Sequence, residues 1–159
     1  MKKDYQLSAS IICSNFANLS KDIKVLERGK IDRIHFDVMD GMFVPRYGLP
    51  PEILRQIREV THIPVTVHMM VQDPEPYIDI FKSSGADVIS FHVEPIKHIH
   101  RIVQKIKSSG MKAGLSLNPA TPLNVLDYIL QDLDLVMLMA INPGILGHKL
   151  IPRILGKIS

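Results

Sequence analysis

The sequence contains one cysteine, Cys13, and no tryptophan, and aromatic residues make up only 6% of its 159 residues. A single cysteine excludes an internal disulfide, which is compatible with a reducing compartment, so we expect a cytoplasmic protein. No apolar run reaches the ~18 residues that a membrane-spanning helix needs, and the N-terminus has no apolar signal segment. We therefore expect no membrane partner.

Excess charge is also small, since 19 Lys and Arg residues oppose 16 Asp and Glu residues for a formal net charge of +3. The basic residues are scattered rather than clustered, which predicts a surface of mixed charge and no nucleic-acid partner. The hydrophobic fraction of 46% is typical of a globular protein. The length suits a single domain over residues 1–159.

Strand and helix patterns alternate about six times along the chain. We expect strands at 7–12, 34–41 with a turn at its end, 65–71, 88–93, 113–117 and 135–141. Helices are expected at 17–28, 50–60, 73–85, 99–110, 121–129 and from about 151. This alternation predicts an α/β fold with a parallel sheet, either an open doubly wound sheet or a (β/α)8 TIM-type barrel.

Polar side chains lie on five of the expected strands or directly after them. They are Ser10, His35, Asp37, His68, His92, Glu94 and Asn118. A (β/α)8 barrel collects its functional groups from the ends of several strands, so this distribution favours the barrel. Such barrels usually need about 250 residues, so we expect a domain that is incomplete at its C-terminal side. Six strands would leave unpaired edges, and we therefore expect a homo-oligomer.

The second and third expected strands carry a candidate metal site. Side-chain alternation places His35, Asp37 and Met39 on one face, and apolar residues on the other. His68 and Met70 share a face of the next strand. Two imidazoles and a carboxylate with open positions suit Zn, Fe, Mn or Co, so the pattern predicts a divalent metal cation. The alternative is a packed core, because the eight methionines can simply fill space.

Across most of its length, the sequence resembles the ribulose-phosphate 3-epimerase family. The matching segments lie at 8–12, 35–45 (His-Phe-Asp-Val-Met-Asp-Gly-Met-Phe-Val-Pro), 68–71, 92–94, 118–122 and 139–144. The resemblance implies a (β/α)8 barrel that inverts C3 of a phosphorylated ketose with the help of a divalent metal.

Position by position, the resemblance also implies roles for individual residues. His35, Asp37 and His68 would bind the metal, and Asp37 would be one of two acid/base carboxylates. Ser10, His68 and the loop Gly144, Ile145, Leu146 and Gly147 would contact the substrate, and Met39, Met70 and Met139 would form an apolar cap. No residue matches the second carboxylate or the main phosphate loop of the family. His92 and Glu94 could orient the ligands or simply bond to each other in the core.

Inverting a carbon beside a carbonyl requires a base on one face and an acid on the other, with an enediolate between them. A metal can stabilise the charge of that enediolate. The resemblance thus implies interconversion of D-ribulose 5-phosphate and D-xylulose 5-phosphate in the pentose phosphate pathway. Alternatives remain open: a 3-epimerase of a hexulose 6-phosphate such as allulose 6-phosphate, a metal-dependent hydrolase on the same barrel, or a truncated, non-catalytic metal-binding remnant.

Overall fold

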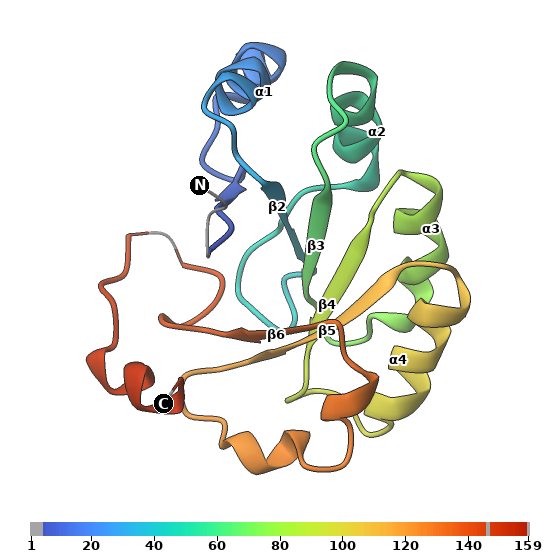
Figure 1. Cartoon of the computed structure of the whole chain (residues 1–159), viewed down its shortest axis with the longest axis vertical. Coiled ribbons are helices and arrows are strands. Elements are labelled where there is room, and N and C mark those ends of the chain that lie inside the picture. Colours follow the sequence, from blue (N-terminus) through green and yellow to red (C-terminus); the bar gives the residue numbers. More distant parts are fainter. Residues whose placement is uncertain (1–4, 146, 159) are drawn as a thin grey trace.

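The computed structural model describes residues 5–145 and 147–158, which form one curled, six-stranded parallel sheet (Figure 1). Its strands pair in chain order and are β1 (Ser8–Ser10), β2 (Arg33–Met39), β3 (Val65–Met70), β4 (Val88–His92), β5 (Lys112–Leu117) and β6 (Leu135–Leu138). Four α-helices cover the outer side of the sheet: α1 (Leu19–Arg28), α2 (Pro51–Val60), α3 (Ile78–Ser83) and α4 (Ile99–Ser108). The predicted α/β fold with six βα units of a TIM-type barrel is confirmed.

Two of the predicted helices are wrong as α-helices. The segment at 121–129 forms only the 3-10 turns Leu123–Leu126 and Leu130–Asp132, and the segment from 151 forms the 3-10 helix Pro152–Lys157. Asn124 and Asp127 are poor residues for a helix interior because their side chains compete for backbone hydrogen bonds. Gly156 lies in the second turn of the last segment, and glycine is unfavourable inside a helix. The first segment therefore forms two 3-10 turns and the second a 3-10 helix in place of α-helices.

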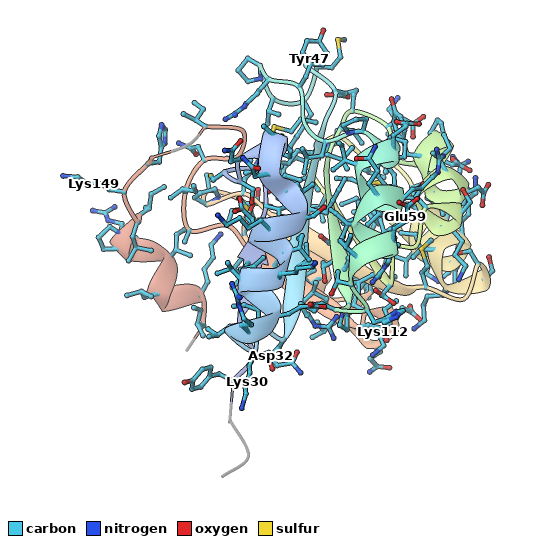
Figure 2. The ribbon with its side chains drawn as sticks, turned by 90° about the horizontal axis from the view of Figure 1, so that it is seen from above. Lys30, Asp32, Tyr47, Glu59, Lys112 and Lys149 are labelled. Atoms are coloured by element: carbon cyan, nitrogen blue, oxygen red, sulfur yellow. The ribbon has the colours of Figure 1, made fainter. Side chains whose placement is uncertain are left out.

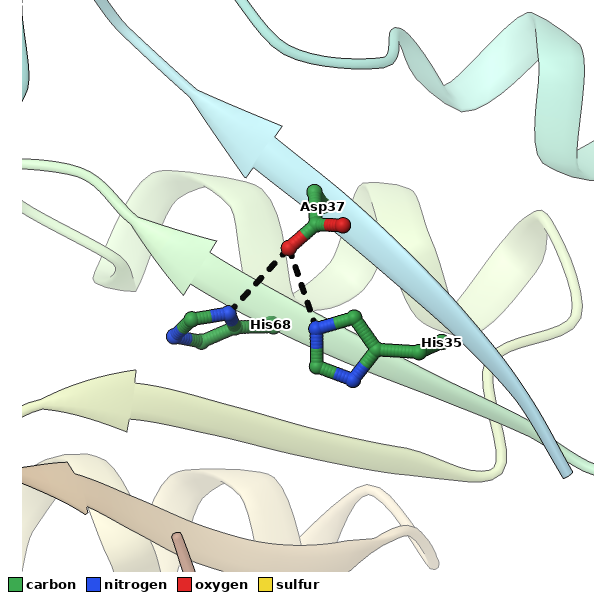
Figure 3. Close-up of side chains that lie close together, drawn as sticks. All are labelled: His35, Asp37 and His68. Atoms are coloured by element: carbon green, nitrogen blue, oxygen red, sulfur yellow. Dashed lines mark hydrogen bonds and ion pairs between the residues drawn. The ribbon is translucent and has the colours of Figure 1, made fainter. Parts of the chain in front are cut away.

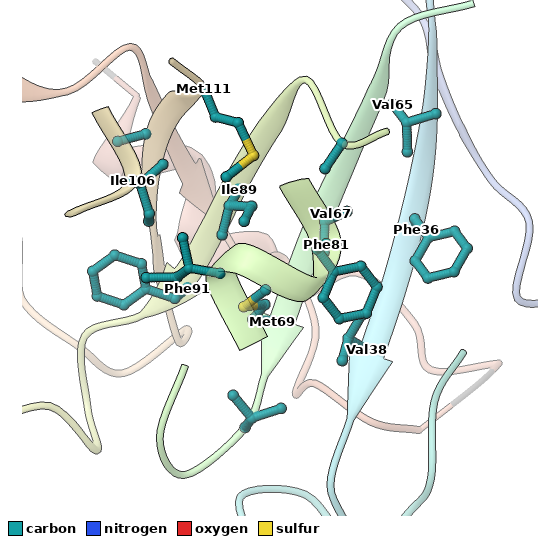
Figure 4. Packing of buried hydrophobic residues seen from close by; sticks show 14 of the residues in the cluster. Phe36, Val38, Val65, Val67, Met69, Phe81, Ile89, Phe91, Ile106 and Met111 are labelled. Atoms are coloured by element: carbon teal, nitrogen blue, oxygen red, sulfur yellow. The ribbon is translucent and has the colours of Figure 1, made fainter. Parts of the chain in front are cut away.

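The core lies between the outer face of the sheet and the helices. Ile34, Phe36 and Val38 of β2 are buried there, as their alternation with polar residues predicts. Figure 4 shows Phe36 beside Phe81 of α3, and the two rings meet edge to face at 6.0 Å. Polar side chains consequently occupy the inner face, where they are available for chemistry.

Burial changes across the sheet from its centre to its edges. Every residue of β3 and β4 is buried, whereas β1 and β6 contain none that is fully buried. Among the described residues β1 pairs only with β2, and β6 pairs only with β5. Both strands are shorter than the expected 7–12 and 135–141. The expected homo-oligomer stays a prediction.

All strands point toward the same end of the molecule. Figure 2 shows Tyr47, from the loop after β2, at one end, and Asp32 and Lys112, at the starts of β2 and β5, at the other. Residues that follow the strands therefore gather around the end that carries Tyr47. Within the described residues, none of the helices has the length and apolar character to cross a bilayer.

The loop after β2 folds back along the strand that it leaves. The backbone N–H of Gly48 donates to the Met39 carbonyl at 3.1 Å, and that of Leu49 donates to the Asp37 carbonyl at 2.8 Å. At the start of this loop, the Asp40 carboxylate accepts backbone N–H groups of Phe43 and, at 2.6 Å, of Gln72. Burial raises the pKa of Asp40, but these hydrogen bonds outweigh burial and hold it below its usual value.

Substitution of Gly48 tests how closely this loop must approach β2. An added Cβ would lie 2.6 Å from the Asp37 carbonyl oxygen, so we expect Gly48→Ala to lower the free energy of unfolding by about 2 kcal/mol. Urea denaturation measures this change. Gly156→Ala is the matched control, because an added Cβ there meets no atom within 4 Å. Equal stability of the two variants would contradict the close packing of the loop.

Candidate active site

Three side chains from β2 and β3 converge on the inner face of the sheet. The parallel register pairs Asp37 directly with His68, and His35 lies two residues before Asp37 on the same face. Asp37 Oδ1 lies 3.0 Å from His35 Nε2 and 3.3 Å from His68 Nδ1 (Figure 3). One ligand atom from each residue lies within 4.8 Å of the others. Sequence alternation and register together thus produce the predicted His/Asp/His group.

The spacing of these atoms fits ligands that share one cation. With metal–ligand distances of about 2.1 Å, neighbouring ligand atoms are about 3.0 Å apart at a right angle and about 3.4 Å apart at a tetrahedral angle. The observed 3.0 and 3.3 Å fall in this range. Two nitrogens and one oxygen also form a donor set that first-row divalent metals accept. The residues present therefore fit a divalent metal.

Asp37 is held in its charged form. Burial raises its pKa, but the hydrogen-bond contacts with His35 and His68, the positive charge that His35 can carry and the hydrogen bond from Ser10 lower it more. The Ser10 hydroxyl donates to Asp37 Oδ2 at 2.6 Å. The net pKa of Asp37 lies well below that of an ordinary carboxyl. A buried, ionised carboxylate is thus available to a cation or to a substrate proton.

His68 is held in its neutral form. Its side chain is 2% exposed, and burial lowers its pKa to about 4. The nearby rings of His35 and His92, with centroids 5.1 Å from that of His68, also oppose a positive charge on it. A neutral imidazole keeps one ring-nitrogen lone pair, which a metal ligand requires.

A second set of contacts leads away from His68. His68 Nε2 lies 3.0 Å from His92 Nε2, and His92 Nδ1 lies 3.0 Å from Glu94 Oε2. Burial raises the pKa of Glu94, but hydrogen bonds from His92, Thr121 and the Asn118 backbone lower it to about 2. Glu94 is therefore ionised. Sequence reasoning left the role of this pair open, because only the structure shows that His92 contacts His68.

An open cavity of about 360 Å³ adjoins the His/Asp/His group. This volume lies in the range of small-molecule sites. One wall comes from β1 to β3 and the other from the segment 137–145, which contains the end of β6 and the loop after it. Its lining includes Ser10, His35, Asp37, His68, Met39, Met70, Met139, Gly144 and Ile145. Most of the residues assigned by resemblance are thus brought together.

The predicted apolar cap and loop differ in how closely they approach the cavity. Met39 and Met70 are buried with Val44, whereas Met139 is half-buried on the opposite wall. Gly147 does not line the cavity, and Leu146 lies outside the described residues. Gly144 has a φ of 82°, and a Cβ there would lie 2.6 Å from Val44 Cβ. Glycine is therefore needed where the loop after β6 meets the loop after β2.

Two residues near the site carried no prediction. Cys13, which follows β1 closely, lines the cavity and is exposed. The ring of Phe43, from the loop after β2, lies 4.8 Å from that of His92 and covers it. Their positions just after strands β1 and β2 are the signal that could have identified them, because all such positions gather at this end of a parallel sheet.

Known proteins resemble this chain in sequence. The ribulose-phosphate 3 epimerase family matches residues 6–159. The ribulose-phosphate 3-epimerase of Bacillus subtilis is 46% identical over 97% of this chain and 71% of its own length. The Escherichia coli K12 enzyme of the same name is 40% identical over 98% of the chain and 70% of its own length. The chloroplastic ribulose-5-phosphate-3-epimerase of Arabidopsis thaliana is 44% identical over 99% of the chain, which spans 57% of that protein.

Solved structures resemble the fold. A mutant tryptophan synthase α-subunit from Pyrococcus furiosus superposes with a TM-score of 0.63 at 16% identity, covering 87% of this chain and 66% of the α-subunit. A second structure of that subunit gives a TM-score of 0.64 at 16% identity with the same coverage. At this identity the likeness shows the barrel fold alone.

The buried state of His68 predicts how the metal-free protein responds to acid. The folded pKa of about 4 lies below the unfolded value of about 6.5, so the unfolded chain binds the proton first. Stability from His68 is therefore complete above about pH 6.5 and decreases toward pH 4, by about 3 kcal/mol. NMR titration of the His68 imidazole and urea denaturation at each pH measure both effects. A His68 midpoint near pH 6.5 would contradict the prediction.

Proposed function

Because this chain belongs to the ribulose-phosphate 3-epimerase family, we propose that it carries the metal-binding and proton-transfer centre for interconverting D-ribulose 5-phosphate and D-xylulose 5-phosphate. The observation that carries the proposal is the ionised Asp37 carboxylate, which two imidazoles approach at 3.0 and 3.3 Å beside an open cavity. The names of the relatives favour a pentulose phosphate over a hexulose phosphate.

His35, Asp37 and His68 would hold the divalent cation. A cation held there would act as a Lewis acid and stabilise negative charge that develops on the substrate oxygens. Nitrogen and carboxylate ligands accept Zn, Fe, Mn and Co alike, so the donor set defines a class of metals. Ser10 fixes the orientation of the carboxylate by donating to its second oxygen at 2.6 Å.

Asp37 is the proposed base at C3 of the ketose. Its low pKa makes it a weak base in the open site, and substrate that displaces water from the cavity would raise that pKa by desolvation. Met39, Met70 and Met139 would exclude water from the reacting carbon with their apolar, polarisable side chains. Ser10, His68 and the loop residues Gly144, Ile145, Leu146 and Gly147 are the proposed substrate contacts.

Complete inversion needs an acid on the opposite face of C3. The cluster of metal-binding side chains found in residues 5–145 and 147–158 contains one carboxylate, that of Asp37. We therefore propose that this chain exchanges the C3 proton on one face faster than it epimerises the substrate. A second acidic group from another polypeptide or segment would be needed for rapid turnover.

Deuterium exchange tests the proposal directly. The chain, loaded with Zn, Mn or Fe, is incubated with D-ribulose 5-phosphate in deuterated water, and mass spectrometry follows deuterium at C3 in both epimers. We expect deuterium to enter recovered D-ribulose 5-phosphate before D-xylulose 5-phosphate accumulates. Asp37→Asn should reduce this exchange by at least about 100-fold, because a positioned base contributes that much. Asp79→Asn, which changes an exposed carboxyl of α3, is the control.

The outcomes separate the alternatives. Deuterium appearing equally fast in both epimers would show that the second acid is supplied, and would contradict the one-face proposal. No exchange with any of the three metals would contradict a proton-transfer role for Asp37 and favour a non-catalytic metal-binding chain.

A further inference from the structure

Glu94, His92 and His68 form a continuous hydrogen-bonded chain that ends at the proposed metal ligands. Its two links, Glu94 Oε2 to His92 Nδ1 and His92 Nε2 to His68 Nε2, are both 3.0 Å long. The side chains of His92 and His68 are 0% and 2% exposed, so both rings are enclosed by the protein. The beginning of the chain, the Glu94 carboxylate, is 23% exposed.

Counting protons shows that the hydrogen bonds linking Glu94, His92 and His68 can run in either of two directions. Three contacts connect its members and Asp37: Glu94 with His92, His92 with His68, and His68 Nδ1 with Asp37 Oδ1. Each contact needs one proton, but two neutral imidazoles supply only two. One of the three contacts must therefore lie between two lone pairs. The 3.0 Å separation of His92 Nε2 and His68 Nε2 indicates a shared proton there, so the contact without one is at Glu94 or at Asp37. Whichever contact receives the proton fixes the tautomers of both histidines.

The two carboxylates differ in their other donors. Asp37 Oδ1 already lies 3.0 Å from His35 Nε2, and Oδ2 accepts the Ser10 hydroxyl. Glu94 Oε1 accepts the Asn118 backbone N–H at 2.7 Å and the Thr121 hydroxyl, whereas the donor to Oε2 is His92. The Glu94 contact is also the shorter, at 3.0 Å against 3.3 Å for His68 with Asp37. The proton therefore belongs at Glu94.

We propose that Glu94 is a positioning residue that sets the tautomers of His92 and His68, and so presents the His68 Nδ1 lone pair to the cation. His92 Nδ1–H donates to Glu94, and His68 Nε2–H donates to His92. The contact left without a proton, between His68 Nδ1 and Asp37 Oδ1, is the one that a cation would fill. This inference rests on the proposed metal site and extends it to residues that do not bind the metal.

Glu94→Gln should reverse the direction of the hydrogen bonds that link residue 94, His92 and His68. The backbone N–H of Asn118 can only donate, so the glutamine oxygen must stay on that side and its NH2 group must face His92 Nδ1. His92 then carries its proton on Nε2, and His68 carries its proton on Nδ1, where it blocks metal binding. We expect the affinity for Zn²⁺ to fall about 10- to 100-fold, the range found when such supporting carboxylates are lost.

The experiment reads tautomers and affinity separately. Ring ¹⁵N chemical shifts of the metal-free full chain report which nitrogen of each histidine is protonated, and chelator competition reports the Kd for Zn²⁺. Glu52→Gln, which changes an exposed carboxyl of α2 that pairs with Arg55, is the matched control and should leave both readouts unchanged. Glu94→Ala removes the acceptor without supplying a donor, so His68 should populate both tautomers.

Failure of the proposed role of Glu94 and failure of the proposed metal site give different results. Wild-type tautomers in both Glu94→Gln and Glu94→Ala, or a Zn²⁺ affinity equal to that of wild type in Glu94→Gln, would overturn the role of Glu94. If the wild-type chain does not bind Zn²⁺, Mn²⁺ or Fe²⁺, the proposed metal site fails. The tautomer reversal measured without metal would still decide whether Glu94 orders the two histidines.

Discussion

The parallel register of β2 and β3 is the constraint on which the site depends. It sets Asp37 opposite His68, and a shift of one residue would turn every polar group of β2 into the core. The apolar residues that alternate with the polar residues of β2 hold that register, because Phe36 is fully buried beneath the helices. Packing on one face of the strand therefore determines the chemistry on the other.

Much of this arrangement could be predicted from the sequence. Alternation along 34–39 places polar and apolar residues on opposite faces, and repeated βα patterns bring the ends of parallel strands together. The His/Asp/His group follows from those two regularities. Family resemblance then supplied the expected chemistry, which alternation alone does not specify.

Other features depend on geometry that the sequence does not encode locally. The His68–His92 contact requires the β3–β4 register and one rotamer of each ring, so spacing alone could not distinguish it from ordinary core bonding. The apolar stripe at 121–129 resembles a helix, yet i to i+3 hydrogen bonds such as that from Ile129 to Leu126 dominate there. The wall formed by 137–145 depends on the close approach of Gly144 to Val44.

The burial gradient across the sheet has a consequence for local unfolding. Amide protons of β3 and β4 sit in the best-packed part of the molecule, whereas β1 and β6 have few neighbours to hold them. Fraying should therefore begin at the two edges and leave the centre folded. His68 and His92 lie on the central strands, while Ser10 lies on a fraying one. The imidazole pair would thus outlast the hydroxyl contact to Asp37 in partly opened states.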